Sequence, residues 1–213
     1  MASAQDDAGR VKSMTRRAIK SSTYIMAPLM MGLAFCAEPI VRLVLTDKWL
    51  PCVPFLRIFC ITYMFYPIHT ANLNAIKAMG RSDLFLKLEI AKKIVGMALL
   101  LSTMWFGVMA MAYSLLVSSV FSQIINSWPN RKLLNYGYLE QLRDILSGIA
   151  LAVVMGCCVS LISLLGLSNA VTLLIQIPLG AVIYIAASAL LHLESFEYLM
   201  DMIRPMVRKI IRK

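Results

Sequence analysis

Six apolar segments, each long enough to cross a lipid bilayer, recur along the chain and leave only short polar stretches between them. About 20 apolar residues in a helix span the hydrocarbon core at a rise of about 1.5 Å per residue. The sequence therefore predicts an all-α integral membrane protein. We expect a bundle of about six transmembrane helices at residues 21–45, 52–79, 84–104, 107–126, 145–165 and 171–191.

Composition agrees with a membrane protein. The chain has 213 residues, of which 60% are hydrophobic and 15% are charged. In a soluble domain about a quarter of the residues are charged. A net charge of +10 would suggest nucleic-acid binding in a soluble protein, but here the basic residues lie between the apolar segments. This placement is typical of membrane topology, and we expect no nucleic-acid partner.

The distribution of Lys and Arg predicts how the chain is oriented. Four segments hold 18 of the 21 Lys and Arg residues, with 5, 5, 3 and 5 in residues 1–20, 77–93, 127–144 and 192–213. Basic residues concentrate on the cytoplasmic side of a membrane, so both termini are predicted to be cytoplasmic, which an even number of spans also requires. We interpret residues 1–20 as an amphipathic surface helix or a solvated leader, 127–144 as a polar loop and 192–213 as a basic tail.

Several local features refine the predicted helices. Pro28 should kink the first span, because proline removes a helical hydrogen bond. Ser82 and Asp83 are interpreted as the N-cap of the third span. Glu89 and Lys93 are four residues apart and can pair along one helix face. Small residues recur at every fourth position of the fourth and fifth spans and predict close helix packing: Ala110, Ser114, Ser118 and Ser122, then Gly148, Ala152, Gly156 and Ser160.

Residues 66–93 combine many polar groups with two of the apolar segments. Charged groups inside a span cost a few kcal/mol and commonly face other helices or a polar cavity. Lys87 is expected to reach the cytoplasmic interface, whereas Lys92 and Lys93 lie roughly 15 Å beyond the start of the third span. His69 is interpreted either as a hydrogen-bonded packing residue or as a proton carrier, and the nearby asparagines either as helix connectors or as path residues. The candidates for a substrate path are Arg57, His69, Asn72, Asn74, Lys77, Arg81, Glu89, Lys92 and Lys93.

Signatures of catalysis are missing from the sequence. There is no glycine-rich phosphate loop, and the two histidines, His69 and His192, lie in different environments and cannot build a zinc site. No nucleophile, base and orienting group are arranged as catalysis requires. We therefore expect a transporter rather than an enzyme, with no catalytic residues and no metal site.

Three stretches carry a resemblance to a known family. They read PLMMGLAFCAEPIVRLVL (28–45), DKWLPCVP (47–54) and ANLNAIKAMGRSDLFLKLEIAKK (71–93), of which the last is the most specific. In these stretches the chain resembles the C-terminal half of Wzx-type flippases, the O-antigen and polysaccharide transporters of the multidrug/oligosaccharidyl-lipid/polysaccharide superfamily. The resemblance runs through almost the whole chain and is least clear beyond about Gly148.

This resemblance implies a transport function. Such proteins flip undecaprenyl-diphosphate-linked oligosaccharides across the bacterial inner membrane by alternating access, driven by an ion gradient or the membrane potential and without a bound cofactor. They have twelve or fourteen helices in two lobes, as in MATE- and MurJ-like transporters, and this chain would form one lobe. Besides membrane lipid, we then expect a missing N-terminal half, or another membrane chain, as its partner, and no transport by this chain alone.

The resemblance also implies roles for the path residues. Proton coupling would fall to His69 or Glu89. The cations available for a diphosphate group are Arg57, Lys77, Arg81, Lys92 and Lys93. Two other functions stay open. One is a structural or partner-dependent membrane subunit that uses the small-residue faces, and the other is a membrane-embedded transferase that uses His69 and needs a second polar cluster.

Overall fold

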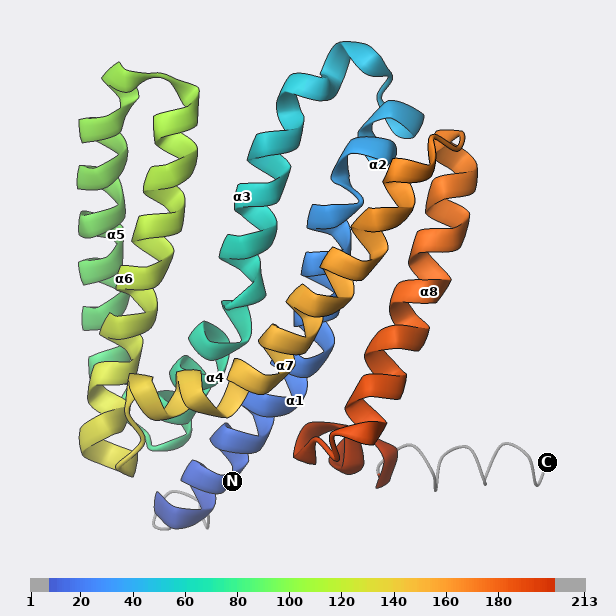
Figure 1. Cartoon of the computed structure of the whole chain (residues 1–213). Helices are drawn as coiled ribbons and strands as arrows, with labels where there is room; N and C mark the ends of the chain where they lie inside the picture. The colour runs from blue at the N-terminus through green and yellow to red at the C-terminus, as the bar shows by residue number, and fades with distance from the viewer. Residues whose placement is uncertain (1–7, 202–213) are drawn as a thin grey trace, which may run out of the picture.

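The helices of this chain run back and forth along a common direction, as the computed structural model shows for residues 8–201 (Figure 1). No β-strand occurs within that range, and short turns or 3-10 segments join the helices. The structure therefore confirms the all-α membrane fold that the apolar segments predicted.

Most of the described helices are long enough to cross the hydrocarbon core, since five of them have 22 or more residues. The α-helices are α1 (Ala8–Phe35), α2 (Ala37–Val44), α3 (Val53–Met64), α4 (Tyr66–Ala78), α5 (Ser82–Thr103), α6 (Val108–Leu134), α7 (Tyr138–Ser160) and α8 (Asn169–Leu190). The 3-10 segments are η2 (Asp47–Cys52), η3 (Met104–Phe106) and η4 (Leu161–Leu165). Residues 194–201 are again helical.

The bundle is organised around α1, which packs along α7 and also contacts α3 and α4. Helix α8 packs against α7, and the hairpin of α5 and α6 contacts the bundle mainly through α3 and α4, with further contacts from α6 to α1 and α7 (Figure 1). The described chain begins and ends at the same end of the bundle, the lower end in Figure 1, where α4 turns into α5 and α6 into α7. The connections from α2 to α3, α5 to α6 and α7 to α8 lie at the other end.

Within the described residues, four segments could cross a membrane by length and composition: Asp47–Ala78, Val108–Leu134, Tyr138–Leu165 and Asn169–Leu190. Helices α1 and α2 together are also long and apolar enough, but they meet at an angle of 66°. They add a fifth crossing if they form one broken span. Helix α5 has the required length but carries four charged residues near its middle. The chain is therefore a multi-pass membrane protein, while a crossing by α5, the count of six spans and the cytoplasmic orientation stay predictions.

The first turns of α1 are packed against the rest of the protein. Val11, Thr15 and Ile19 are buried along one face of this helix, and Val11 and Ile19 belong to an apolar cluster with residues of α4 and α7. The apolar face of the amphipathic segment at residues 1–20 thus contacts protein over its described part. Residues 1–7, and residues 202–213 of the predicted tail, lie outside the described residues.

The predicted loop at residues 127–144 is wrong, because α6 continues to Leu134 and α7 begins at Tyr138. Ser127 and Asn130, which suggested a loop, are buried on the helix and hydrogen-bonded to other helices. Polar residues are typical of loops because water satisfies them there. Here the protein interior satisfies them, so the polar sequence is compatible with a continuous helix.

The main bend of the first span lies at Cys36, beyond the predicted kink at Pro28. Helix α1 continues through Pro28 as one helix, and the 66° bend separates it from α2. Pro39 accounts for this position, because in a continuous helix its ring would collide with the carbonyl group of Phe35. Helix α1 therefore ends at Phe35, the residue whose carbonyl group the Pro39 ring would otherwise meet.

Helix α7 approaches α1 closely at Gly156. A Cβ atom at Gly156 would overlap the aromatic ring of Phe35, and Ala152 one turn earlier is fully buried. On the small-residue face predicted for the fifth span, Gly156 therefore lies where α7 packs against α1, whereas Gly148 lies nearest to Tyr184 of α8.

Replacing Gly156 with alanine should destabilise the bundle by about 1–3 kcal/mol, because the added methyl group displaces the Phe35 ring in a packed interface. The free energy of unfolding, measured by denaturant titration in detergent micelles, reports this loss. Gly32→Ala is the matched control, since the nearest side-chain atom, on Met155, is 4.0 Å from the new Cβ atom. Equal stabilities of the two variants would contradict close packing at Gly156.

Candidate functional site

A cluster of buried amides joins three helices in the lower part of the bundle. The Nδ2 atom of Asn72 on α4 donates to Oε1 of Gln141 on α7 at 2.7 Å and to Oγ of Ser127 on α6 at 3.1 Å. Its Oδ1 atom accepts from Asn130 at 2.6 Å and from Gln141 at 3.0 Å. Asn72, Asn130 and Gln141 have no exposed surface. The hydrogen bonds of the Asn72 side-chain amide thus join α4 to α6 and α7.

Asn72→Ala should lower the free energy of unfolding by about 1–3 kcal/mol, because Asn130 and Gln141 would lose buried hydrogen-bond partners. Asn74→Ala is the matched control on the same helix, since Asn74 is exposed. Denaturant titration of both variants in the same micelles compares them. A loss at Asn74 as large as that at Asn72 would argue against the cluster as the source of stability.

A second polar cluster is centred on Lys92 of α5. Lys92 is the one buried residue of that helix, with 8% of its surface exposed. Its Nζ atom lies 2.5 Å from Oε1 of Glu89 and 3.1 Å from Nε2 of His69 on α4. Because an ammonium group only donates hydrogen bonds, Nε2 of His69 accepts and the ring proton resides on Nδ1. The structure thus brings together three of the candidate path residues.

This cluster balances a buried charge. An isolated ammonium group in apolar surroundings is costly, whereas a carboxylate at hydrogen-bond distance compensates much of that cost. Glu89 supplies the compensating charge from one turn earlier on α5. The expected pair between Glu89 and Lys93 is wrong, because Lys93 is exposed and Lys92 occupies the face that meets α4. Tyr66 stacks on the His69 ring, with 5.6 Å between the ring centroids.

Lys92→Met should destabilise the protein by about 1–3 kcal/mol, since it leaves the partly exposed Glu89 carboxylate without its cation. Adding Glu89→Gln to this variant should restore most of the loss, because no unpaired charge then remains. Lys93→Met serves as the control and should be nearly neutral. Unfolding titrations of the three variants would refute the pairing if the double variant were no more stable than Lys92→Met alone.

The other candidate path residues lie apart from this cluster. Asn74 is exposed, and Nζ of Lys77 lies 4.3 Å from the centroid of the Phe85 ring. Arg81 pairs with Asp83, with 3.2 Å between Nε and Oδ1. The expectation that Ser82 and Asp83 cap the N-terminus of the third span is wrong. The N-cap of α5 is Arg81 itself, without a side-chain hydrogen bond, and not Ser82 or Asp83.

Arg57 belongs to a different region, on the face of α3 opposite to α6. Its Nε atom donates to the carbonyl oxygen of Ala34 at 3.3 Å. Arg57 lines a cavity of about 680 Å³ together with residues of α1, α2, α7 and α8, among them Glu38 and Arg42. A smaller cavity of about 230 Å³ lies between α3, α4 and α6 and contains His69. The two cavities share no lining residue, so Arg57 and His69 do not line one continuous space.

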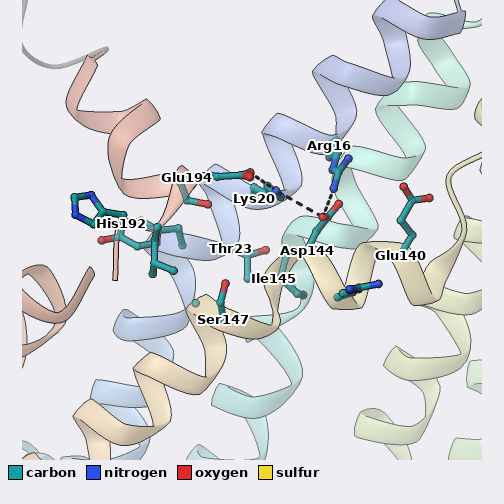
Figure 2. A pocket seen from close by; sticks show the side chains of 14 residues that line it. Arg16, Lys20, Thr23, Glu140, Asp144, Ile145, Ser147, His192 and Glu194 are labelled. Atoms are coloured by element: carbon teal, nitrogen blue, oxygen red, sulfur yellow. Dashed lines mark hydrogen bonds and ion pairs between the residues drawn. The ribbon is translucent and has the colours of Figure 1, made fainter. Parts of the chain in front are cut away.

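A third cavity, of about 530 Å³, lies between α1, α7 and residues 192–195 (Figure 2). Its charged lining residues are Arg16, Lys20, Glu140, Arg143, Asp144 and Glu194. The sequence interpretation did not include these residues among the candidates. Arg16 and Lys20 lie one helical turn apart in the segment interpreted as a leader, and this spacing was the one signal that they share a helix face.

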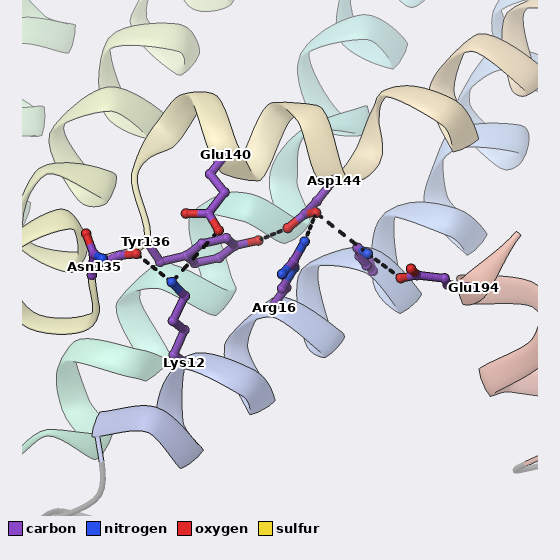
Figure 3. A network of polar contacts seen from close by, with 8 residues as sticks. Lys12, Arg16, Asn135, Tyr136, Glu140, Asp144 and Glu194 are labelled. Atoms are coloured by element: carbon purple, nitrogen blue, oxygen red, sulfur yellow. Dashed lines mark hydrogen bonds and ion pairs between the residues drawn. The ribbon is translucent and has the colours of Figure 1, made fainter.

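The charges beside this cavity form a connected network (Figure 3). Asp144 accepts hydrogen bonds from Arg16 at 2.6 Å and from the Tyr136 hydroxyl at 2.8 Å, and Lys20 lies 3.6 Å away. Lys20 also bonds Glu194 at 2.6 Å, which holds the pKa of the Glu194 carboxyl below its ordinary value. Burial, together with the bond to Asp144, raises the pKa of Tyr136 far above its ordinary value. The network ties the start of α1 to α7 and to residues 194–201.

The fold and the buried polar groups together define the class of this protein. It is a multi-pass helical membrane protein in which buried polar side chains pair across helices. Over residues 8–201, no three His, Cys, Asp or Glu side chains lie close enough together to hold a metal ion.

Two comparisons narrow this class. Residues 1–54 match the model of a family described as polysaccharide biosynthesis protein. Over 123 residues, 57% of this chain, the sequence is 26% identical to a Klebsiella pneumoniae protein described as an uncharacterized membrane protein in the cps region. That match covers 25% of the relative's own length. No solved structure matches the chain. The two matches support the family resemblance seen in the sequence.

Proposed function

We propose that the chain is the C-terminal part of a flippase that exports lipid-linked polysaccharide units across the bacterial inner membrane by alternating access. The observation that carries the proposal is the Lys92 cluster, a charged group buried in a hairpin of an apolar chain whose first quarter matches a polysaccharide biosynthesis family. Intramembrane charges that pair with one another are typical of substrate and ion pathways. The cargo in this proposal is an undecaprenyl-diphosphate-linked oligosaccharide.

The proposal includes a second lobe. The matched segment spans a quarter of the Klebsiella relative, and the α5–α6 hairpin leaves a row of large apolar side chains of α5 exposed. A path between two lobes needs a second wall, supplied by further helices of the same polypeptide or by another membrane chain. The energy source is an ion gradient or the membrane potential, with no resident cofactor, and both termini face the cytoplasm.

A partner-dependent membrane subunit without transport activity is the second candidate. The observation that favours it is the outward face of α5, where large apolar side chains are at least half exposed: Leu86, Ile90, Ile94, Met97 and Leu101. Such a face fits lipid or another helix equally well. A transferase is less favoured, because His69 is engaged by Lys92 and the side chain of Asn72, one turn further along α4, is bonded to Gln141, Asn130 and Ser127.

Complementation of a strain that lacks its lipid-linked oligosaccharide flippase separates these functions. A gene for this chain alone should not restore surface polysaccharide, whereas one that joins it to the upstream helices of a related flippase should. Surface polysaccharide is measured by immunoblot and cell-surface labelling. Restoration by neither gene, with both proteins present in the membrane, would favour the subunit without transport activity.

Two variants of the joined gene refine this test. Lys92→Met should reduce export, because it removes the buried charge from the hairpin, and Lys93→Met should leave export nearly unchanged. Membrane levels of both variants, measured by immunoblot, control for unstable protein. Equal export by the two variants would remove the Lys92 cluster from the transport path.

A further inference from the structure

The cavity between α3, α4 and α6 has a lining unlike the other two. It has a volume of about 230 Å³, and no Asp, Glu, Lys or Arg side chain lines it. Lys92 contacts His69 but is not a lining residue, and its charge is already paired with Glu89. The cavity is therefore neutral, although it adjoins the buried charges of α5.

Two tyrosines form an aromatic corner on one wall of this cavity. The ring centroids of Tyr63 and Tyr66 are 6.3 Å apart, with 59° between the ring planes. Tyr66 stacks on His69 with one face, at an interplanar angle of 12°. Both tyrosines are about half exposed, which leaves aromatic surface for a ligand. A C–H-rich face of a small molecule could pack on this surface.

Serine hydroxyl groups without partners lie on the opposite wall. Among the described contacts, the side chains of Ser118 and Ser122 on α6 make no hydrogen bond. The hydroxyl groups of Tyr63 and Tyr66, on the aromatic wall, make none either. Ser114, one turn before Ser118, instead donates to the carbonyl oxygen of Met111 at 2.8 Å. Unpaired hydroxyl groups are costly where water is scarce. A ligand with several hydroxyl groups of its own would satisfy them.

We propose that this cavity binds a single neutral sugar ring. Aromatic faces on one side and serine hydroxyl groups on the other match the two kinds of surface that a sugar ring presents. The volume is below the roughly 300–1,000 Å³ of sites for drug-sized ligands, so it fits one ring and not an oligosaccharide. The inference rests on the proposed function, because it assigns a glycosyl unit of the exported cargo to these residues and excludes the diphosphate from them.

Saturation-transfer NMR on the whole chain in phospholipid nanodiscs, free of glycoside detergents, tests this inference. The probes are the methyl glycosides of glucose, galactose, mannose and N-acetylglucosamine, with inorganic diphosphate as competitor. At least one glycoside should receive saturation, and diphosphate should not displace it. Tyr66→Ala should weaken its binding about tenfold, the effect of one aromatic contact. Tyr113→Ala is the matched control, because Tyr113 is exposed on α6 and does not line the cavity.

Ser122→Ala provides a milder variant that keeps the helix intact, and it should also weaken glycoside binding. Binding to none of the glycosides, displacement by diphosphate, or equal binding by the serine and tyrosine variants and the wild-type chain would each overturn the sugar site. Failure of the complementation experiment has a different meaning. Glycoside binding that depends on Tyr66 and Ser122 without any export would leave the sugar site in place and remove the flippase function.

Discussion

The hydrogen bonds of Asn72 are the interaction on which the arrangement of the lower bundle depends. A buried amide in an apolar protein is unfavourable unless both its nitrogen and its oxygen are bonded, and here they are bonded to side chains of α6 and α7. Satisfying one residue of α4 therefore positions two other helices. The same bonds keep the polar end of α6 helical, where the sequence suggested a loop.

The charge on Lys92 must also be paired, because an unpaired buried charge costs more free energy than an unpaired buried amide. Glu89 and His69 surround the ammonium group, so the hairpin of α5 and α6 contacts α4 through a paired cation. This pairing also decides the character of the adjoining cavity. The cation is compensated by Glu89 and lies outside the lining of the cavity, so the cavity beside His69 is neutral and is lined by aromatic rings and hydroxyl groups. Charge recognition and sugar recognition would then fall to different parts of the molecule.

Helix α3 separates residues that the sequence suggested for a single path. Arg57 faces a cavity beside α1, α2, α7 and α8, and His69 faces one beside α6. Residue spacing predicts which side chains share a helix face, but it does not predict which neighbour that face meets. For this reason the sequence identified His69, Glu89 and Lys92 as candidates without showing that they meet. It also missed Arg16 and Lys20, whose partner Asp144 is more than a hundred residues away.

The sequence by itself determined the helical class, the positions of the long apolar segments and the small-residue face of α7, because these depend on local composition and spacing. It also pointed to residues 66–93 as the polar centre. The tertiary structure decided which polar groups are compensated: Lys92 instead of Lys93, and Asn72 instead of Asn74. The two residues of each pair lie one or two positions apart, so their side chains point in different directions from the helix axis. Packing of α4, α5, α6 and α7 turns one direction inward and the other outward, and this follows from contacts distant in sequence.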